Sequence, residues 1–201
     1  MAVRFQQSNE SVGKPRGYAR TYHIEDDGRV RWSCDVTNDL WPGVRFVPPD
    51  AAQPEFSMVP SRRIMPLSYR VVTAEDGDVL GLISRSLLPG CRWKLESATA
   101  GEVARIVNPT AWPQALLEQA FDRSVMRFAF MREDVPLGFV LRRPRPPDDR
   151  PGNRLQRWVR QRLTLFDWTL ELERDVERST DLRMLIAATV LLLELDVNVQ
   201  G

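Results

Sequence analysis

The sequence predicts a mainly β protein, a closed antiparallel β-barrel that encloses a hydrophobic C-terminal helix. Several segments alternate apolar and polar residues with a period of two and are separated by glycine turns, a pattern typical of antiparallel hairpins. The final stretch, 181–197, is instead apolar on every side of a helix, so protein must surround it. A barrel can enclose a helix about 10 Å wide, whereas the core between two packed sheets, about 10 Å deep, cannot.

The C-terminal helix is too short to cross a membrane. Ten uncharged residues, Met184 to Leu193, lie between Arg183 and Glu194. At about 1.5 Å of rise per residue they cover roughly 15 Å, and a bilayer core is about 30 Å thick. The segment is therefore predicted to form the centre of the barrel.

About nine or ten half-buried strands precede this helix. Asp-Gly turns at Asp27-Gly28 and Asp76-Gly77 join the first two hairpins, and Gly101 joins the third. The residues predicted to face the core of these hairpins are Tyr22, Ile24, Val30, Trp32, Cys34, Val36, Tyr69, Val71, Leu80, Leu82, Cys91, Trp93 and Leu95.

The pattern resumes after a predicted short helix over 113–121. Core-facing residues are then Met126, Phe128, Phe130, Leu137, Phe139 and Leu141, and in the last strand Phe166, Trp168, Leu170 and Leu172. Because prolines crowd residues 37–67, we expect irregular excursions there, with one short strand near Phe46 or Phe56. We expect residues 1–17 to form a loose tail, 142–153 to form a loop, and 1–201 to form a single domain.

Composition narrows the classes of partner and the compartment. The formal net charge is +1, so no global field draws the chain onto nucleic acid. Cys34 and Cys91 lack a metal or redox spacing and are predicted to be buried thiols. Residues 1–20 contain no apolar signal region, which favours a cytoplasmic location. The strong bias toward arginine over lysine indicates a GC-rich, bacterial genome.

Four segments resemble a known superfamily. They are YRVVTAEDGDVLGLISR (69–85), RWKLE (92–96), WTLELE (168–173) and DLRMLIAATVLLLELD (181–196). In this order they are similar to the tubby C-terminal-like superfamily, and most to bacterial LURP-one-related and phospholipid scramblase-like members. The resemblance implies a tubby-like barrel around a central helix, and a binding role in place of catalysis.

Motifs for catalysis or metal binding are weak in this sequence. His23, the sole histidine, alternates with apolar neighbours and is predicted to lie on the outer face of its strand. Acidic residues before Gly28 and Gly77 are predicted to form turns. The acidic run Glu171, Glu173, Asp175, Glu177 and Asp181 occupies the place of a proposed calcium segment in eukaryotic scramblases, but its arginines and missing glycine favour ion pairing. We therefore expect no enzymatic activity, no metal and no cofactor.

The most suggestive surface is the basic segment 142–162, which carries eight arginines and two aspartates, a net charge of +6. The residues predicted to bind anionic lipid are Arg142, Arg143, Arg145, Arg154, Arg157 and Arg160. Tubby domains bind phosphoinositides through a basic surface, and each basic residue near an anionic leaflet contributes about 1 kcal/mol. The protein would then sit at the periphery of a membrane without spanning it.

Three alternatives remain open at this stage, and scramblase activity is the weakest of them because a short buried helix cannot form a path for lipid across a membrane. The basic segment also fits a solvated loop that reflects only the arginine bias of the chain. A second possibility is a protein-interaction or scaffold module, which an exposed apolar patch containing Trp41, Phe46 and Phe56 would favour.

Overall fold

The computed structural model describes residues 2–8, 18–37, 40, 43–62, 67–86, 91–107, 127–144, 166–172 and 180–197. The strands are β1 (Ala2–Ser8), β2 (Tyr18–Asp26), β3 (Arg29–Thr37), β4 (Val44–Phe46), β5 (Phe56–Pro60), β6 (Ser68–Thr73), β7 (Val79–Arg85), β8 (Cys91–Ser97), β9 (Gly101–Val107), β10 (Arg127–Arg132), β11 (Val135–Pro144) and β12 (Phe166–Leu172). The helix α3 (Thr180–Leu192) follows, and a π-helical segment, η1 (Leu193–Val197), continues it.

All twelve strands belong to one antiparallel sheet that curls into a nearly closed barrel. Except for β3 and β4, strands that are consecutive in sequence pair with each other, and β1 also pairs with β12, with Val3 opposite Leu170. The sheet edges β3 and β4 meet through one bridge, where Ser33 and Val47 exchange backbone hydrogen bonds of 2.8 and 2.9 Å. The predicted fold class is confirmed.

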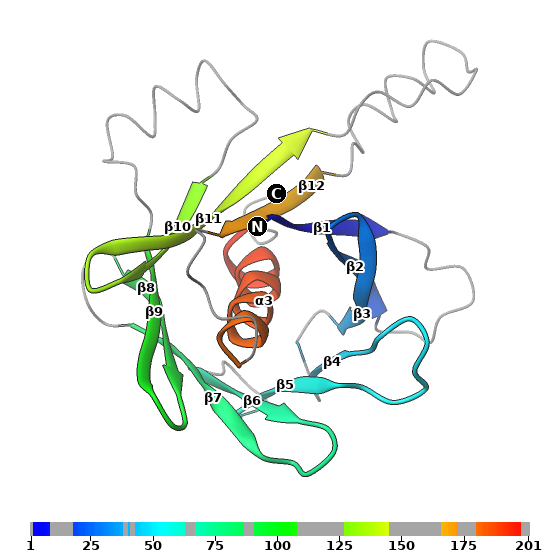
Figure 1. Cartoon of the computed structure of the whole chain (residues 1–201), viewed down its shortest axis with the longest axis horizontal. Helices are drawn as coiled ribbons and strands as arrows, with labels where there is room; N and C mark the ends of the chain where they lie inside the picture. Colours follow the sequence, from blue (N-terminus) through cyan, green and yellow to red (C-terminus); the bar gives the residue numbers. More distant parts are fainter. Residues whose placement is uncertain are drawn as a thin grey trace.

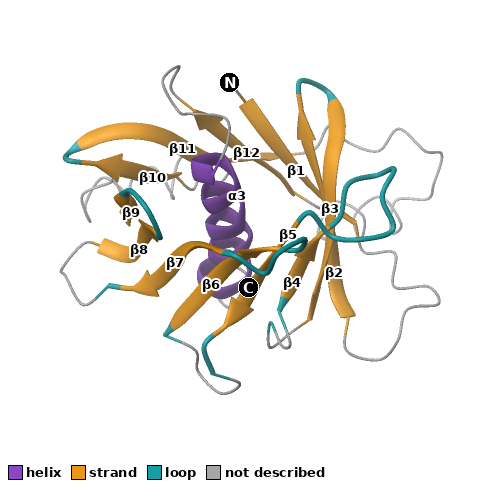
Figure 2. Cartoon of the chain, turned by 60° about the horizontal axis from the view of Figure 1, so that its bottom comes forward, coloured by secondary structure: helices purple, strands orange, loops and turns teal. Residues whose placement is uncertain are grey.

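Helix α3 runs through the middle of the ring of strands (Figures 1 and 2). Every side chain from Met184 to Leu193 is 0% exposed, as the all-round apolar pattern predicted. The one polar side chain between Met184 and Leu193, Thr189, donates to the carbonyl of Leu185 at 2.8 Å and so leaves no unsatisfied hydroxyl. Gly81 in β7 lets the helix approach closely, because a Cβ there would lie 2.7 Å from Cε of Met184.

Charged side chains hold both ends of the helical segment against the barrel wall. Near its start, Arg183 Nη2 lies 2.7 Å from Oε1 of Glu55, and the other oxygen of Glu55 accepts a bond from Trp32 Nε1 at 2.8 Å. In η1, buried Glu194 accepts hydrogen bonds from Arg20 at 2.6 Å and from the Tyr22 hydroxyl at 2.5 Å. Both β2 and β3 are thus tied to the helix.

In two strands, β7 and β11, the sequence predicted the wrong set of alternating residues to face the core. Gly81 and Ile83 of β7 are buried, whereas Leu80 and Leu82 are only half-buried. In β11 the buried residues are Gly138 and Val140, and Leu137, Phe139 and Leu141 are half-buried. Both strands point a glycine inward, and the pairings that precede them contain bulges, between Val71 and Val72 and between Phe130 and Met131. A bulge shifts the alternation by one residue.

A third bulge, between Ile24 and Glu25, leaves Val30 exposed, although its alternation with Trp32 predicted a core position. The other residues predicted to face inward in the first hairpin are buried, namely Tyr22, Ile24, Trp32, Cys34 and Val36.

The proline-rich stretch contains two strands where the sequence predicted at most one. Phe46 in β4 and Phe56 in β5 lie opposite each other, and their rings stack with centroids 4.3 Å apart. Both side chains are 0% exposed, so the apolar patch that would have included them is wrong. Trp41 lies outside the described residues.

The predicted loose tail over 1–17 is wrong for residues 2–8, which form β1 and place Val3 and Phe5 in the core. The sequence prediction missed this strand because polar Arg4, Gln6 and Gln7 dominate it. The helix predicted over 113–121 lies outside the described residues.

Candidate functional site

The arginines predicted to bind lipid are only partly within the described chain. Arg142 and Arg143 lie in β11 near its C-terminal end, and their backbone pairs with Trp168 and Asp167 of β12. Arg145, Arg154, Arg157 and Arg160 lie outside the described residues, in the connection from β11 to β12.

The strand register gathers further arginines at the same end of the barrel. Arg85 ends β7 opposite Trp93, Arg92 follows the first residue of β8, and Arg127 begins β10 opposite Leu141. Since neighbouring strands are antiparallel, these positions share one end with Arg142 and Arg143. The connections that leave this end are 9–17, 38–43, 61–67, 86–90, 108–126 and 145–165, and they contain eleven basic and six acidic residues. We call it the basic end.

The opposite end of the barrel carries the reverse charge. Its strand-to-strand turns are 27–28, 47–55, 74–78, 98–100 and 133–134, and they contain no basic residue. Their acidic residues are Asp27, Asp50, Glu55, Glu75, Asp76, Asp78, Glu133 and Asp134. The connection 173–179 from β12 to α3 leaves the same end and contains three acidic residues and two arginines. We call this the acidic end. Counted along the sequence, the connections at the two ends of the barrel thus differ in sign, although the net charge of the chain is only +1.

A pocket of about 320 Å³ opens at the basic end, between β7 and β8. Among the described residues, its lining consists of Arg85, Ser86, Cys91, Arg92 and Trp93. The backbone N–H of Ser86 donates to the carbonyl of Arg92 at 3.0 Å, which joins the two walls. The described lining contains two guanidinium groups and no carboxylate.

Aromatic rings and a bulge hold these side chains. The guanidinium carbon of Arg85 lies 5.9 Å from the centroid of the Trp93 ring, and that of Arg92 lies 5.5 Å from the ring of Phe128. The register of β8 against β9 shifts between Cys91 and Trp93, so Arg92 is the additional residue of a bulge. Bulges re-aim side chains at the rims of barrels and beside binding sites.

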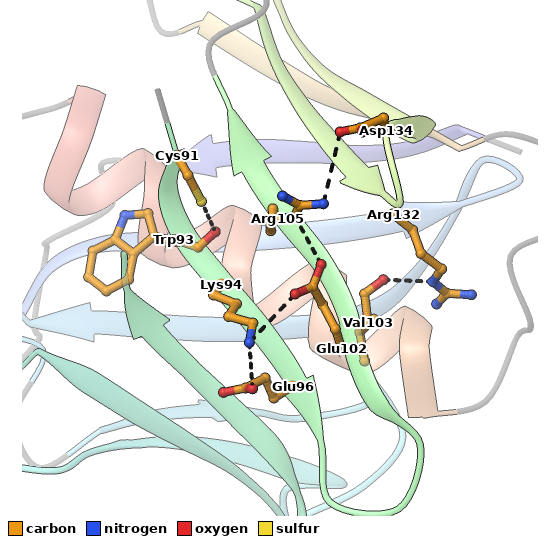
Figure 3. A network of polar contacts seen from close by, with 9 residues as sticks. All are labelled: Cys91, Trp93, Lys94, Glu96, Glu102, Val103, Arg105, Arg132 and Asp134. Atoms are coloured by element: carbon orange, nitrogen blue, oxygen red, sulfur yellow. Dashed lines mark hydrogen bonds and ion pairs between the residues drawn. The ribbon is translucent and has the colours of Figure 1, made fainter. Parts of the chain in front are cut away.

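The outer face of β8 and β9 carries a second charged cluster, in which each cation lies near carboxylates (Figure 3). Lys94 Nζ lies 2.8 Å from Glu96 and 3.5 Å from Glu102, and Arg105 Nε lies 2.9 Å from Glu102. This last contact is an ion pair whose angle is not that of a hydrogen bond. Asp134 lies 3.9 Å from Arg105. Acidic partners therefore surround these cations, and we interpret the cluster as a structural cross-strand ladder.

Two cysteines differ in their surroundings. Cys34 is buried in β3, where desolvation first, then the carboxylates of Asp35 and Glu194, raise the pKa of its thiol. Cys91 is half-buried in the pocket wall, and its Sγ lies 3.5 Å from the carbonyl oxygen of Trp93. Both are free thiols, so the prediction that they form no disulfide is confirmed, but full burial holds for Cys34 alone.

The other sequence candidates are placed as follows. His23 lies on the outer face of β2, between Gln6 of β1 and Ser33 of β3, as predicted. Asp27 and Gly28 form a turn with φ of 52° and 75°, which confirms a turn-forming role. Of the acidic run, Glu171 is half-buried in β12, and Glu173, Asp175 and Glu177 lie outside the described residues. The described residues contain no group of three potential metal-ligating side chains.

Sequence reasoning missed Arg85, Ser86 and Arg92 as site residues. An arginine at each end of a hairpin connection, next to Trp93, was the available signal. This signal could be interpreted only after the strand register placed the end of β7, the start of β8 and the end of β11 at the same end of the barrel.

No known protein family, characterised protein or solved structure matches this chain. In the described part of the chain, no helix combines the length and the hydropathy that a bilayer span requires.

Proposed function

We propose that this chain is a non-enzymatic binding module of the tubby-like, LURP-one-related type, which associates with anionic membrane lipid through its basic end. The observation that carries this proposal is the separation of charge along the barrel. The basic end faces an anionic leaflet favourably, and the eight acidic residues of the opposite turns make the reverse orientation unfavourable.

The barrel interior supports a binding site at an end of the molecule. Helix α3 fills the centre, and the side chains from Met184 to Leu193 are completely buried. A ligand would therefore meet loops and strand ends, as in other barrels whose interior is packed.

An exposed leucine lies among the arginines of the basic end. Leu67 is 63% exposed, and its carbonyl accepts a hydrogen bond from the backbone N–H of Arg85 at 2.8 Å. Peripheral membrane proteins combine apolar side chains that enter the acyl boundary with basic residues that contact headgroups. Leu67 and Arg85 form such a pair.

Vesicle sedimentation tests the proposal. The wild-type chain should sediment at low salt with vesicles that contain phosphatidylglycerol and not with pure phosphatidylcholine. The triple variant Arg154→Glu, Arg157→Glu, Arg160→Glu should bind at least a hundredfold more weakly, since each basic residue contributes about 1 kcal/mol and the reversed charges are repelled.

A matched triple variant controls for net charge. Arg29, Arg45 and Arg70 are exposed residues of β3, β4 and β6, outside the connections of the basic end, and changing them to Glu alters net charge by the same amount. This variant should retain most of the binding. Equal losses in both triple variants, or no loss in the first, would refute binding through the basic end.

A protein-interaction role was the alternative to lipid binding. Its proposed apolar patch loses Phe46 and Phe56, which are buried in the core. No other described feature favours it.

A further inference from the structure

The barrel closes at a seam that differs from every other strand contact in the described part of the chain. Strands β3 and β4 are the two edges of the sheet, and they lie beside each other where the ring closes (Figures 1 and 2). Among the described residues, only Ser33 and Val47 exchange backbone hydrogen bonds across this seam. All other neighbouring strands are joined by three or more residue pairs. The backbone alone therefore holds the seam weakly.

The sequence keeps this single bridge from extending toward the acidic end. Ser33 lies opposite Val47 and the strands are antiparallel, so Pro49 falls at the position opposite Arg31. Proline has no backbone N–H to donate to a neighbouring strand. The register shift between β2 and β3 also leaves Arg31 as the additional residue of a bulge, and a bulge bends its strand.

Side chains close the seam where the backbone does not. Oε2 of Glu55 accepts a hydrogen bond from Nε1 of Trp32 in β3 at 2.8 Å, and Oε1 lies 2.7 Å from Nη2 of Arg183 in α3. The backbone N–H of Glu55 donates to the carbonyl of Phe46 in β4 at 2.9 Å. One residue thus joins both edges of the sheet to the helix. We call these contacts the Glu55 clasp.

The closed seam covers a cluster of aromatic rings. The rings of Trp32 and Phe56 meet edge to face with centroids 5.8 Å apart, and Phe46 stacks on Phe56. All three side chains are at most 1% exposed. Separation of β3 from β4 brings these rings into contact with water, which the hydrophobic effect opposes.

We propose that the seam between β3 and β4 is the place where the barrel opens, and that the Glu55 clasp holds it closed. When the seam opens, β3 stays paired with β2, and β4 stays paired with β5. Opening uncovers the aromatic cluster without unfolding the sheet. Glu55 belongs to a turn of the acidic end, so this device is independent of membrane binding through the basic end.

Amide hydrogen exchange measured by NMR tests the opening, because β3 contains its own reference. Successive residues of a strand direct their N–H groups alternately to its two neighbours. Ser33 and Val47 donate across the seam, and we call their N–H groups the seam amides. The N–H groups of Trp32 and Cys34 face β2, and we call them the reference amides. Local opening predicts that the seam amides exchange about tenfold faster than the reference amides, or more.

Removal of the clasp should act on the seam alone. Glu55→Ala should speed exchange of the seam amides by a further factor of about ten and leave the reference amides unchanged. Arg183→Gln removes only the ion pair and should produce a smaller change in the same direction. Glu102→Ala is the matched control, because the Glu102 side chain is also 32% exposed and ion-paired, with Arg105. This control should leave the seam amides at the wild-type rate.

Three results would overturn the proposal. Equal exchange of seam and reference amides in the wild type would mean that the seam opens only when the hairpin of β2 and β3 also unfolds. Equal acceleration of all four amides by Glu55→Ala and by Arg183→Gln would indicate a general loss of stability. Acceleration of the seam amides by Glu102→Ala as large as that by Glu55→Ala would remove the special role of Glu55.

Discussion

Glu194 shows how a single buried charge can be accommodated in an apolar segment. It follows ten uncharged residues and is almost completely buried, yet Arg20 and Tyr22 both donate hydrogen bonds to its carboxylate. A buried carboxylate without partners would cost several kcal/mol. Both donors come from β2, so the contact fixes where the end of the helical segment meets the sheet.

Tyr69 is the opposite case, a buried polar group without a described partner. Its ring packs against Trp93 with centroids 6.0 Å apart, and its hydroxyl accepts and donates no hydrogen bond among the described residues. Burial raises the pKa of Tyr69 from 10.0 to about 12. The folded chain therefore keeps a proton that the unfolded chain releases.

This shift predicts a loss of stability at alkaline pH. The contribution of Tyr69 is fully present below pH 10 and is lost as the pH rises toward about 12. Tyr69→Phe should remove that part of the pH dependence and should raise the free energy of unfolding at neutral pH by about 1 kcal/mol, because it removes an unsatisfied hydroxyl. Urea unfolding across this pH interval measures both effects.

Tyr22→Phe is the control for Tyr69→Phe. It removes a donor from buried Glu194 and should lower stability at neutral pH by about 1.5–3 kcal/mol. If Tyr69→Phe destabilised the protein as Tyr22→Phe does, the Tyr69 hydroxyl would have a partner and the interpretation would be wrong.

At the scale of elements, α3 is the part of the fold that the sequence predicts best. Ten consecutive uncharged residues indicate burial on all sides of the helix. The prediction therefore does not require a choice of which residues face the core. Strands are harder, because an inward glycine such as Gly81 or Gly138 is invisible to a pattern of apolar residues. The space it leaves is filled from the helix by Met184 or from the neighbouring strand by Leu172, contacts known only in the folded chain.

The prediction of irregular structure over the proline-rich stretch 37–67 was wrong for a similar reason. Prolines at 48, 49 and 54 bracket the connection between β4 and β5 and leave the strands themselves largely free of them. The count of prolines predicted irregular structure, whereas their positions permit a hairpin. Likewise β1 depends on pairing with both β2 and β12, which local sequence does not report.

Central burial of α3 predicts that a charge there abolishes folding. Leu185→Asp or Leu192→Asp places a carboxylate at a fully buried site, at a cost comparable to the roughly 5–15 kcal/mol of stability of a typical domain. Circular dichroism and gel filtration should show an unfolded or aggregated chain. Leu195→Asp, at a half-buried position in η1, should remain folded. A folded, soluble Leu185→Asp barrel would contradict the central position of the helix.

At the scale of the whole molecule, the candidate site depends on topology more than on any motif. Net charge of +1 conceals two ends of opposite sign, and only the up-and-down order of the strands assigns each turn to an end. The sequence predicted the basic segment after β11. The sequence could not predict that Arg85 and Arg92, which are far in sequence from that segment, lie at the same end of the barrel.

The most direct test of membrane binding through the basic end is the environment of single fluorescent labels. Leu67 at the basic end and Val135 at the acidic end are 63% and 62% exposed, so they make matched positions. Each is changed to Cys in a Cys91→Ser background and labelled with an environment-sensitive dye, while buried Cys34 stays unlabelled.

On addition of phosphatidylglycerol vesicles at low salt, emission of the label at 67 should shift to the blue and increase, and that of the label at 135 should stay unchanged. A response at 135 equal to that at 67, or no response at 67 while the protein sediments with the vesicles, would contradict docking through the basic end.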